Sequence, residues 1–196
     1  MTDLLTPAPT GFRERLLGGL TAALEQQEYH EVTITDIVRE ARTSKRTFYE
    51  HFAGKQECFL ALVRENNERR RDEVAAAVDP TADRRVQVHQ AIDALFSSVH
   101  EHPTVFLHSI RALRSLGEEG HALVRDDLAA FVSLLQTLSD TPELRAAGIP
   151  APSREASVVL VGGLRELIAL TLEEGRDPAE VIEEATAVTL AVLDPS

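Results

Sequence analysis

The residues whose types and spacing could do chemistry gather in one segment, residues 33–57, which reads TITDIVREARTSKRTFYEHFAGKQE. Its middle, residues 44–47, carries hydroxyl and basic side chains, and aromatic side chains follow at Phe48, Tyr49 and Phe52. Guanidinium and ammonium groups pair with phosphate oxygens and with the edge of guanine, and hydroxyl groups bond to phosphates. These residue types in this order therefore favour contact with nucleic acid.

Two short helices joined by a tight turn are expected to position these side chains. Thr33 and Asp36 have the spacing of a capping box at the start of the first helix, and Ser44 is placed to cap the second. The turn falls at residues 42–43, and the packing side of the first helix carries Ile37 and Ala41. This arrangement predicts a helix-turn-helix, in which the first helix packs and the second presents its N-terminal residues.

The second helix is expected to enter the major groove, which admits one α-helix. Arg46 could pair bidentately with O6 and N7 of guanine, a contact worth about 1–3 kcal/mol of discrimination between bases. Thr47 could touch a thymine methyl or a phosphate, and Tyr49 and His51 are placed to reach phosphate oxygens. Lys55 adds charge at a helix N-terminus, whose dipole already attracts anions.

The spacing of Thr33, Ile37, Ala41, Ser44, Thr47, Tyr49, Phe52 and Lys55 resembles the TetR family of bacterial transcriptional regulators. The remaining two-thirds of the chain match that family only in length and helical pattern. Two positions depart from the usual motif. Arg42 stands where glycine is usual, which costs roughly 1 kcal/mol or more in a left-handed turn, and Cys58, expected in the core, stands where leucine is usual. The residues assigned to DNA contact are Thr33, Arg42, Ser44, Lys45, Arg46, Thr47, Tyr49, His51 and Lys55.

The whole chain is expected to be all-α, with about nine helices, because helical periodicity continues nearly everywhere and no long alternating segment indicates a sheet. Residues 1–54 are interpreted as the helix-turn-helix DNA-binding domain, and residues 55–196 as the regulatory, ligand-binding and dimerisation domain. Expected helices cover 13–27, 55–78, 81–101, 103–115, 119–139, 154–174 and 178–193, with a long loop at 140–152. The only charge run, Arg69-Arg70-Arg71, is interpreted as a solvated helix face.

The last two helices predict a dimer interface. They are the most apolar helical stretches, and each interior glycine of Gly162-Gly163 costs roughly 1 kcal/mol against alanine, which close helix approach would offset. The pattern resembles the two helices that each TetR-family subunit contributes to a four-helix dimer interface; the alternative is a buried pair within one subunit. The interface residues expected are Val158, Val161, Gly162, Leu164, Ile168, Ile182, Val188 and Leu190.

The central helices are expected to enclose a ligand, as the resemblance implies. The cavity would be mostly aliphatic, with histidine or arginine as its few polar anchors. Its expected lining residues are Phe96, His100, Phe106, His108, Arg111, Phe131 and Leu135. No metal or other cofactor is expected, because His100 and His102 are followed at once by Pro103 and no carboxylate partner is evident.

Composition limits the remaining classes of protein. No apolar run approaches the roughly 20 residues of a membrane span, and residues 1–12 carry no lysine or arginine, so neither a membrane protein nor a secretory signal is expected. A single cysteine excludes an internal disulfide. No catalytic grouping or glycine-rich phosphate loop is recognisable, so an enzyme is not expected. We therefore expect a cytoplasmic protein.

The charge distribution decides how an acidic chain could bind DNA. The total is −12, whereas residues 39–55 carry a local net charge of +3 and include both lysines of the chain. The sequence thus predicts one small DNA-binding face and weak non-specific binding. The expected function is a homodimeric repressor, released from a palindromic operator by a small hydrophobic effector. Alternatives are an activator, a regulator without an effector, or a helical protein-interaction module.

Overall fold

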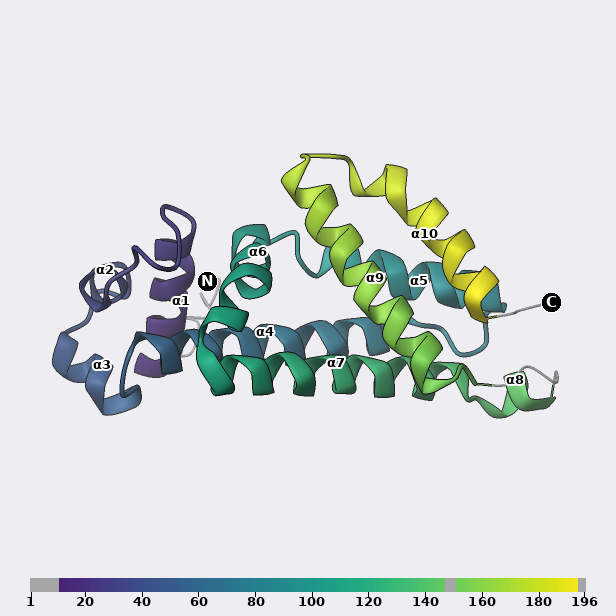
Figure 1. The fold of residues 1–196 in the computed structure, drawn as a ribbon, viewed down its shortest axis with the longest axis horizontal. Coiled ribbons are helices and arrows are strands. Elements are labelled where there is room, and N and C mark those ends of the chain that lie inside the picture. Colours follow the sequence, from purple (N-terminus) through teal and green to yellow (C-terminus); the bar gives the residue numbers. More distant parts are fainter. Residues whose placement is uncertain (1–10, 147–150, 194–196) are drawn as a thin grey trace, which may run out of the picture.

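The computed structural model describes residues 11–146 and 151–193, and the regular structure within these ranges is entirely helical (Figure 1). The expected all-α fold is therefore confirmed. The helices are α1 (Phe12–Leu24), α2 (Ile34–Glu40), α3 (Lys45–His51), α4 (Lys55–Ala77), α5 (Arg84–Ser97), α6 (Pro103–Ala112), the 3-10 helix η1 (Leu113–Ser115), α7 (Gly117–Ser139), α8 (Pro142–Ala146), α9 (Arg154–Glu173) and α10 (Pro178–Leu193).

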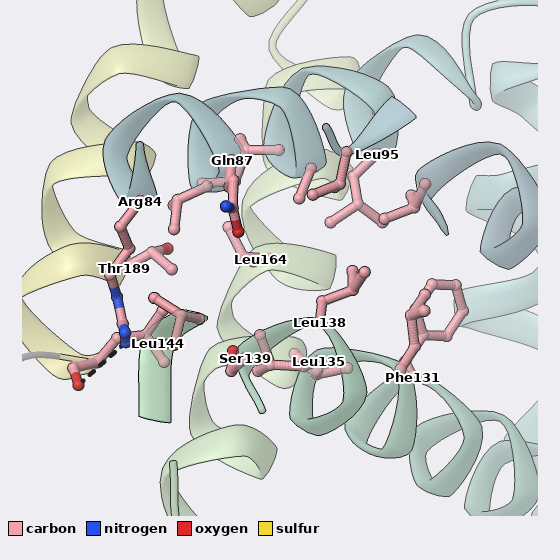
Figure 2. Close-up of a pocket in the computed structure, with 18 residues that line it drawn as sticks. Arg84, Gln87, Leu95, Phe131, Leu135, Leu138, Ser139, Leu144, Leu164 and Thr189 are labelled. Atoms are coloured by element: carbon pink, nitrogen blue, oxygen red, sulfur yellow. Dashed lines mark hydrogen bonds between the residues drawn. The ribbon is translucent and has the colours of Figure 1, made fainter. Parts of the chain in front are cut away.

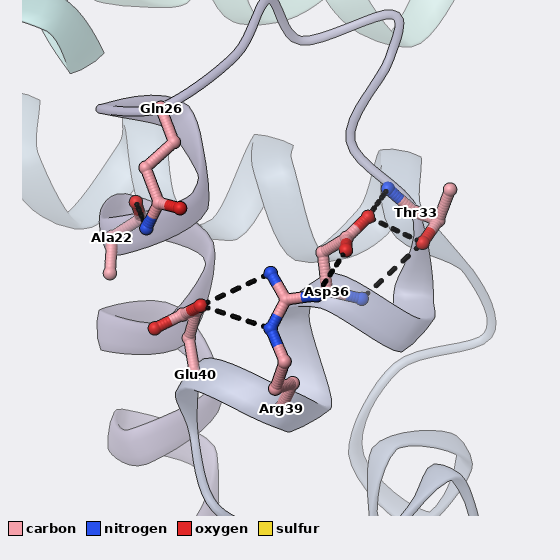
Figure 3. Close-up of polar contacts among 6 residues, drawn as sticks. All are labelled: Ala22, Gln26, Thr33, Asp36, Arg39 and Glu40. Carbon is pink, nitrogen blue, oxygen red and sulfur yellow. Dashed lines mark hydrogen bonds and ion pairs between the residues drawn. The ribbon is translucent and has the colours of Figure 1, made fainter.

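The helix starts follow the capping chemistry expected from the sequence. The Thr33 N–H donates to Asp36 Oδ2 at 3.0 Å, and the Asp36 N–H donates to Thr33 Oγ1 at 3.3 Å, so the capping box at α2 is complete (Figure 3). The Thr33 hydroxyl and the Thr33 N–H both donate to the Asp36 carboxylate and lower its pKa to about 2. At α3, Ser44 Oγ accepts from the Thr47 N–H at 3.1 Å. The N-termini of both helices of the helix-turn-helix are thus held by local hydrogen bonds.

One hydrophobic cluster joins α1, α2, α3 and the first half of α4. Gly19 lets α1 and α2 approach closely, because a Cβ there would lie 2.5 Å from the Ile37 carbonyl oxygen. Cys58 is fully buried in this cluster, as expected, and burial raises the pKa of its thiol to about 12. The cluster reaches along α4 to Val63 and includes Val105 of α6, so the proposed boundary after residue 54 falls inside a shared core.

The helix α4 connects the N-terminal helices with the rest of the molecule, and α7 runs beside it (Figure 1). A second hydrophobic cluster joins α5, α6, α9 and α10. Two sequence expectations need correction here. The helix α5 begins at Arg84 because Asp83 caps it, accepting from the Val86 N–H at 3.1 Å. The expected loop 140–152 contains α8, which begins at Pro142, a residue that suits the first turn of a helix.

Candidate nucleic-acid interface

The helix α3 has one buried side and one exposed side. Phe48 and Phe52 are buried, and their rings lie 5.8 Å apart between centroids. Tyr49 on the other side is 58 % exposed, and Lys45 and His51 are exposed as well. The aromatic pair therefore anchors α3 to the rest of the domain while its basic residues face outward, which is the geometry that a recognition helix needs.

Arg46 lies on the exposed side of α3. Its side chain is 90 % exposed and pairs with Glu50 at 3.2 Å, one helical turn away. An exposed i,i+4 ion pair contributes little, typically about 0.3–0.5 kcal/mol, so it can be exchanged readily for another partner. Arg46 is consequently able to reach a base edge.

The turn between α2 and α3 has the left-handed conformation in which glycine is usual. Arg42 has φ +49°, and it is the one described non-glycine residue with a positive φ. The Arg42 N–H donates to the Arg39 carbonyl at 3.1 Å, and the Thr43 N–H donates to the Val38 carbonyl at 2.9 Å. These two bonds form a Schellman motif. Arg15 of α1 supports the turn by donating to the Arg42 carbonyl oxygen at 3.2 Å.

Besides Arg46, four of the residues expected at the DNA have side chains with hydrogen-bond partners inside the protein. The Thr33 hydroxyl donates to Asp36 Oδ2 at 2.6 Å, and the Ser44 hydroxyl lies 3.0 Å from Thr47 Oγ1. Lys55 Nζ donates to the carbonyl oxygens of Val32 at 2.7 Å, Tyr29 at 2.9 Å and His30 at 3.4 Å. Burial lowers the pKa of this ammonium group. Lys55 thus ties the α1–α2 loop to the start of α4; its contact with phosphate stays a prediction.

The sequence did not lead us to two residues that support the helix-turn-helix, Gly19 and Arg15. Gly18-Gly19 inside an amphipathic helix was a usable signal, because an interior glycine costs stability unless a close approach requires it. Arg15 gave no such signal, since its partner, the Arg42 carbonyl, lies 27 residues away in the chain. Among the described residues, no cluster of histidine, cysteine or acidic side chains could hold a metal ion.

The C-terminal helices enclose an apolar cavity bounded by α4, α5, α7, α8, α9 and α10 (Figure 2). Of the expected ligand residues, Phe131 and Leu135 line it, and Phe106 lines a second cavity together with Phe131. The others lie elsewhere. Phe96 is in the hydrophobic core, His108 Nε2 lies 3.2 Å from the Leu24 carbonyl oxygen, His100 is exposed, and Arg111 pairs with Glu173 at 2.7 Å.

The residues expected at a dimer interface differ in their exposure on α9 and α10, and the interface itself stays a prediction. Gly162 and Val188 are exposed, and a Cβ at Gly162 would meet no described atom within 4 Å. Val158, Val161, Leu164 and Leu190 are partly buried, whereas Ile168 and Ile182 belong to the core of the subunit itself. Val159, which the sequence reasoning left out, is exposed on the same face. None of the described helices is long and apolar enough to span a membrane.

The chain is similar in sequence to known bacterial transcriptional regulators. The profile described as "Bacterial regulatory proteins, tetR family" matches residues 16–62. The HTH-type transcriptional regulator EthR of Mycolicibacterium smegmatis is 26 % identical over 172 residues, covering 85 % of this chain and 79 % of EthR. The HTH-type transcriptional activator FasR of the same species is 29 % identical over 87 residues, 44 % of this chain and 40 % of FasR. In Bacillus subtilis, the uncharacterized HTH-type transcriptional regulator YxbF is 28 % identical over 86 residues, 44 % of this chain and 23 % of YxbF. The matches thus span less than half of FasR and of YxbF.

Solved structures share the fold over nearly the whole chain. The fatty acid degradation regulator FadR of Bacillus halodurans superposes with a TM-score of 0.77 at 16 % identity, covering 97 % of both chains. FadR of Bacillus subtilis, solved in complex with stearoyl-CoA, gives a TM-score of 0.78 at 14 % identity over 91 % of this chain and 98 % of that one. The TetR-family regulator SCO4454 of Streptomyces coelicolor gives 0.72 at 24 % identity, covering 95 % and 90 %. At these identities the likeness is one of fold.

Proposed function

The chain belongs to the TetR family and is a transcriptional regulator with an N-terminal DNA-binding domain; we propose that it is a homodimeric repressor which a small hydrophobic effector releases from its operator. The observation that carries this proposal is α3, whose aromatic side is buried while Lys45, Arg46 and Tyr49 face outward. Two such helices in a dimer would enter successive major grooves of a near-palindrome, about 34 Å apart.

The exposed face of α9 and α10 supports dimerisation. Val159 and Val188 are large apolar side chains left in solvent, and Gly162-Gly163 offers a stretch of helix where a second backbone could approach closely. Burial of apolar surface is the main favourable contribution to protein association. A symmetric pair of these helices would form the four-helix interface that the sequence predicts.

The helix α4 supports coupling between effector and DNA. Its first half belongs to the core that holds α3, and its second half supplies Arg70 and Val74 to the walls of the two cavities. A ligand in those cavities would shift α4 and thereby change the spacing of the two recognition helices. Such coupling free energies are typically about 1–3 kcal/mol, enough to release an operator.

The test of the DNA-binding surface is the binding of the dimer to DNA upstream of its own gene, measured by fluorescence anisotropy. Arg46→Ala should weaken specific binding by roughly tenfold or more and relax the preference at one base pair, since a bidentate contact to guanine is worth about 1–3 kcal/mol. The control is Arg125→Ala on α7, because Arg125 is also exposed and pairs with a nearby glutamate, Glu118 at 2.9 Å. Equal binding by both variants would contradict the assignment of α3.

A second candidate function is transcriptional activation, which the relative FasR favours by its name. That match covers only 44 % of this chain, so it bears on the regulatory mode only weakly. Transcription in vitro from the bound promoter separates the two, because a repressor lowers the transcript level and an activator raises it. The complex of Bacillus subtilis FadR with stearoyl-CoA supports a hydrophobic effector as the class to screen first.

A further inference from the structure

Two neighbouring cavities of different chemistry share walls in the C-terminal helices. The apolar cavity of Figure 2 has a volume of about 90 Å³, and the second cavity, between α4, α5, α6, α7 and α9, about 240 Å³. Both are lined by Leu95, Phe131, Val161 and Leu164. The first cavity is surrounded mainly by aliphatic side chains, with Arg84, Gln87, Ser139 and Thr189 as its polar lining, whereas three arginines, Arg70, Arg114 and Arg165, line the second. The pair therefore has a mainly apolar end and a more strongly cationic end.

Arg70 is the buried cation of the second cavity. It is only 9 % exposed, and its guanidinium lies over the ring of Phe106, 4.7 Å from the centroid. Among the described residues its one hydrogen bond is a long one, from Nη1 to Asn67 Oδ1 at 3.4 Å, and its Nε has no hydrogen-bond partner. Burial lowers its pKa to about 10, so the group remains charged at neutral pH. A buried cation without an ion-pair partner is destabilising unless a ligand supplies one.

The strongest carboxylate neighbour of Arg70 is Asp127, whose charge raises the pKa of the guanidinium against the effect of burial, but no carboxylate of the described residues lies within ion-pair distance of Arg70. Asp127, which lines the same cavity, forms its ion pair with Arg71 at 3.1 Å. Glu166 also lines the cavity but is exposed. Arg114 and Arg165 form no ion pair among the residues that the structure describes, so this end of the site carries more positive than negative charge.

We propose that the two cavities together bind an anionic amphiphile, whose carboxylate pairs with Arg70 and whose aliphatic tail extends past Leu95 and Phe131 into the apolar cavity. The proposal rests on the proposed function, because it names the chemical class of the effector. An engineered apolar cavity of about 150 Å³ holds benzene, so the apolar cavity of about 90 Å³ takes only the end of the tail, and the rest of the tail lies in the second cavity. A neutral molecule would fill the same space but would leave Arg70 unpaired.

The experiment compares two ligands of equal chain length, decanoate and 1-decanol, by isothermal titration calorimetry on the full chain. Charge-assisted hydrogen bonds are roughly twice as strong as neutral ones, so decanoate should bind about tenfold or more tightly than decanol. Arg70→Met keeps an apolar stem and removes the charge, so it should lose this preference while binding decanol at least as well as before. Arg125→Met is the matched control and should behave as the unmodified protein.

A charge-retaining variant, Arg70→Lys, keeps the test informative if the methionine variant does not fold, because it should still prefer decanoate over decanol. Equal affinity for both ligands, tighter binding of decanol, an unchanged preference in Arg70→Met, or no binding of either ligand would overturn the proposal. Operator binding is measured on the same preparations. If the protein still binds its operator but shows no preference for decanoate, only the proposed class of ligand is overturned. If decanoate binds through Arg70 but does not release the operator, the class of ligand is upheld and the proposed role of the ligand as effector is contradicted.

Discussion

The two cations at Lys55 and Arg70 lie on the same helix, α4, and have opposite surroundings. Lys55 Nζ donates to three backbone carbonyl groups of the α1–α2 loop, whereas Arg70 Nε has no hydrogen-bond partner in the described part of the chain. A satisfied cation stabilises the fold, and a buried unsatisfied cation costs stability that a binding function can explain. The difference sets Lys55, which backbone carbonyl groups of the DNA-binding half hold, against Arg70 of the regulatory half, whose charge we propose a ligand pairs.

The largest effect is expected at Lys55. Lys55→Met leaves three carbonyl groups without their donor, and hydrogen bonds to charged groups contribute about 1.5–3 kcal/mol, so the free energy of unfolding should fall by an amount in that range. Urea denaturation measures the change. Lys45→Met on the exposed side of α3 is the control and should alter stability by less than about 0.5 kcal/mol. If the two variants are equally stable, Lys55 does not hold the loop, and its expected contact with DNA becomes the better interpretation.

An effect of opposite sign is expected at Arg70. Replacing a buried charged group by an apolar one of similar size is often stabilising, so Arg70→Met without ligand should raise the free energy of unfolding by roughly 1–2 kcal/mol. Thermal unfolding followed by circular dichroism measures it, with Arg125→Met on the exposed side of α7 for comparison. A loss of stability at Arg70 alone would show that Asn67 and Phe106 already satisfy the guanidinium, and the contrast with Lys55 would disappear.

The smallest effect is expected at the turn before α3. Arg42 holds a left-handed conformation, φ +49°, and Arg42→Gly should relieve about 1 kcal/mol of strain, reduced by the greater freedom of glycine in the unfolded chain to a net gain of roughly 0.5 kcal/mol. If the arginine also contacts phosphate, operator affinity should fall and the slope of log affinity against log salt should decrease by about one. Arg42→Asn, which tolerates the same conformation, checks that the turn rather than the lost charge sets the stability. Unchanged operator binding in both variants would limit Arg42 to a structural role.

Local rules predicted the DNA-binding half well. The capping box at Thr33, the cap at Ser44 and the buried pair Phe48 and Phe52 depend on residues a few positions apart, and the structure contains all of them. The same rules missed α8, because the prolines at 142, 150 and 152 suggested a loop, although Pro142 begins a short helix. Which of the expected residues touch DNA remains a prediction.

The regulatory half could be predicted only in outline, because its site depends on which helix faces meet. Arg69-Arg70-Arg71 was expected to be one solvated face, and this is wrong for Arg70. Successive residues of a helix point in different directions, so Arg69 reaches Glu101 at 3.1 Å, Arg71 reaches Asp127, and Arg70 turns inward. Likewise, His108 was expected at the ligand but lies against α1, a packing partner that no local pattern reveals.

The scarcity of lysine has a consequence for chemical footprinting. The chain has two lysines, and the ammonium group of Lys55 is held by three carbonyl oxygens, whereas Lys45 is exposed at the start of α3. Only the free-base form of an amine reacts with an acylating reagent, and it must also be reachable. Apart from the α-amino group, such a reagent should therefore modify Lys45 first, within the proposed recognition surface. Protection of Lys45 by DNA would then measure directly the fraction of the protein that is bound to DNA.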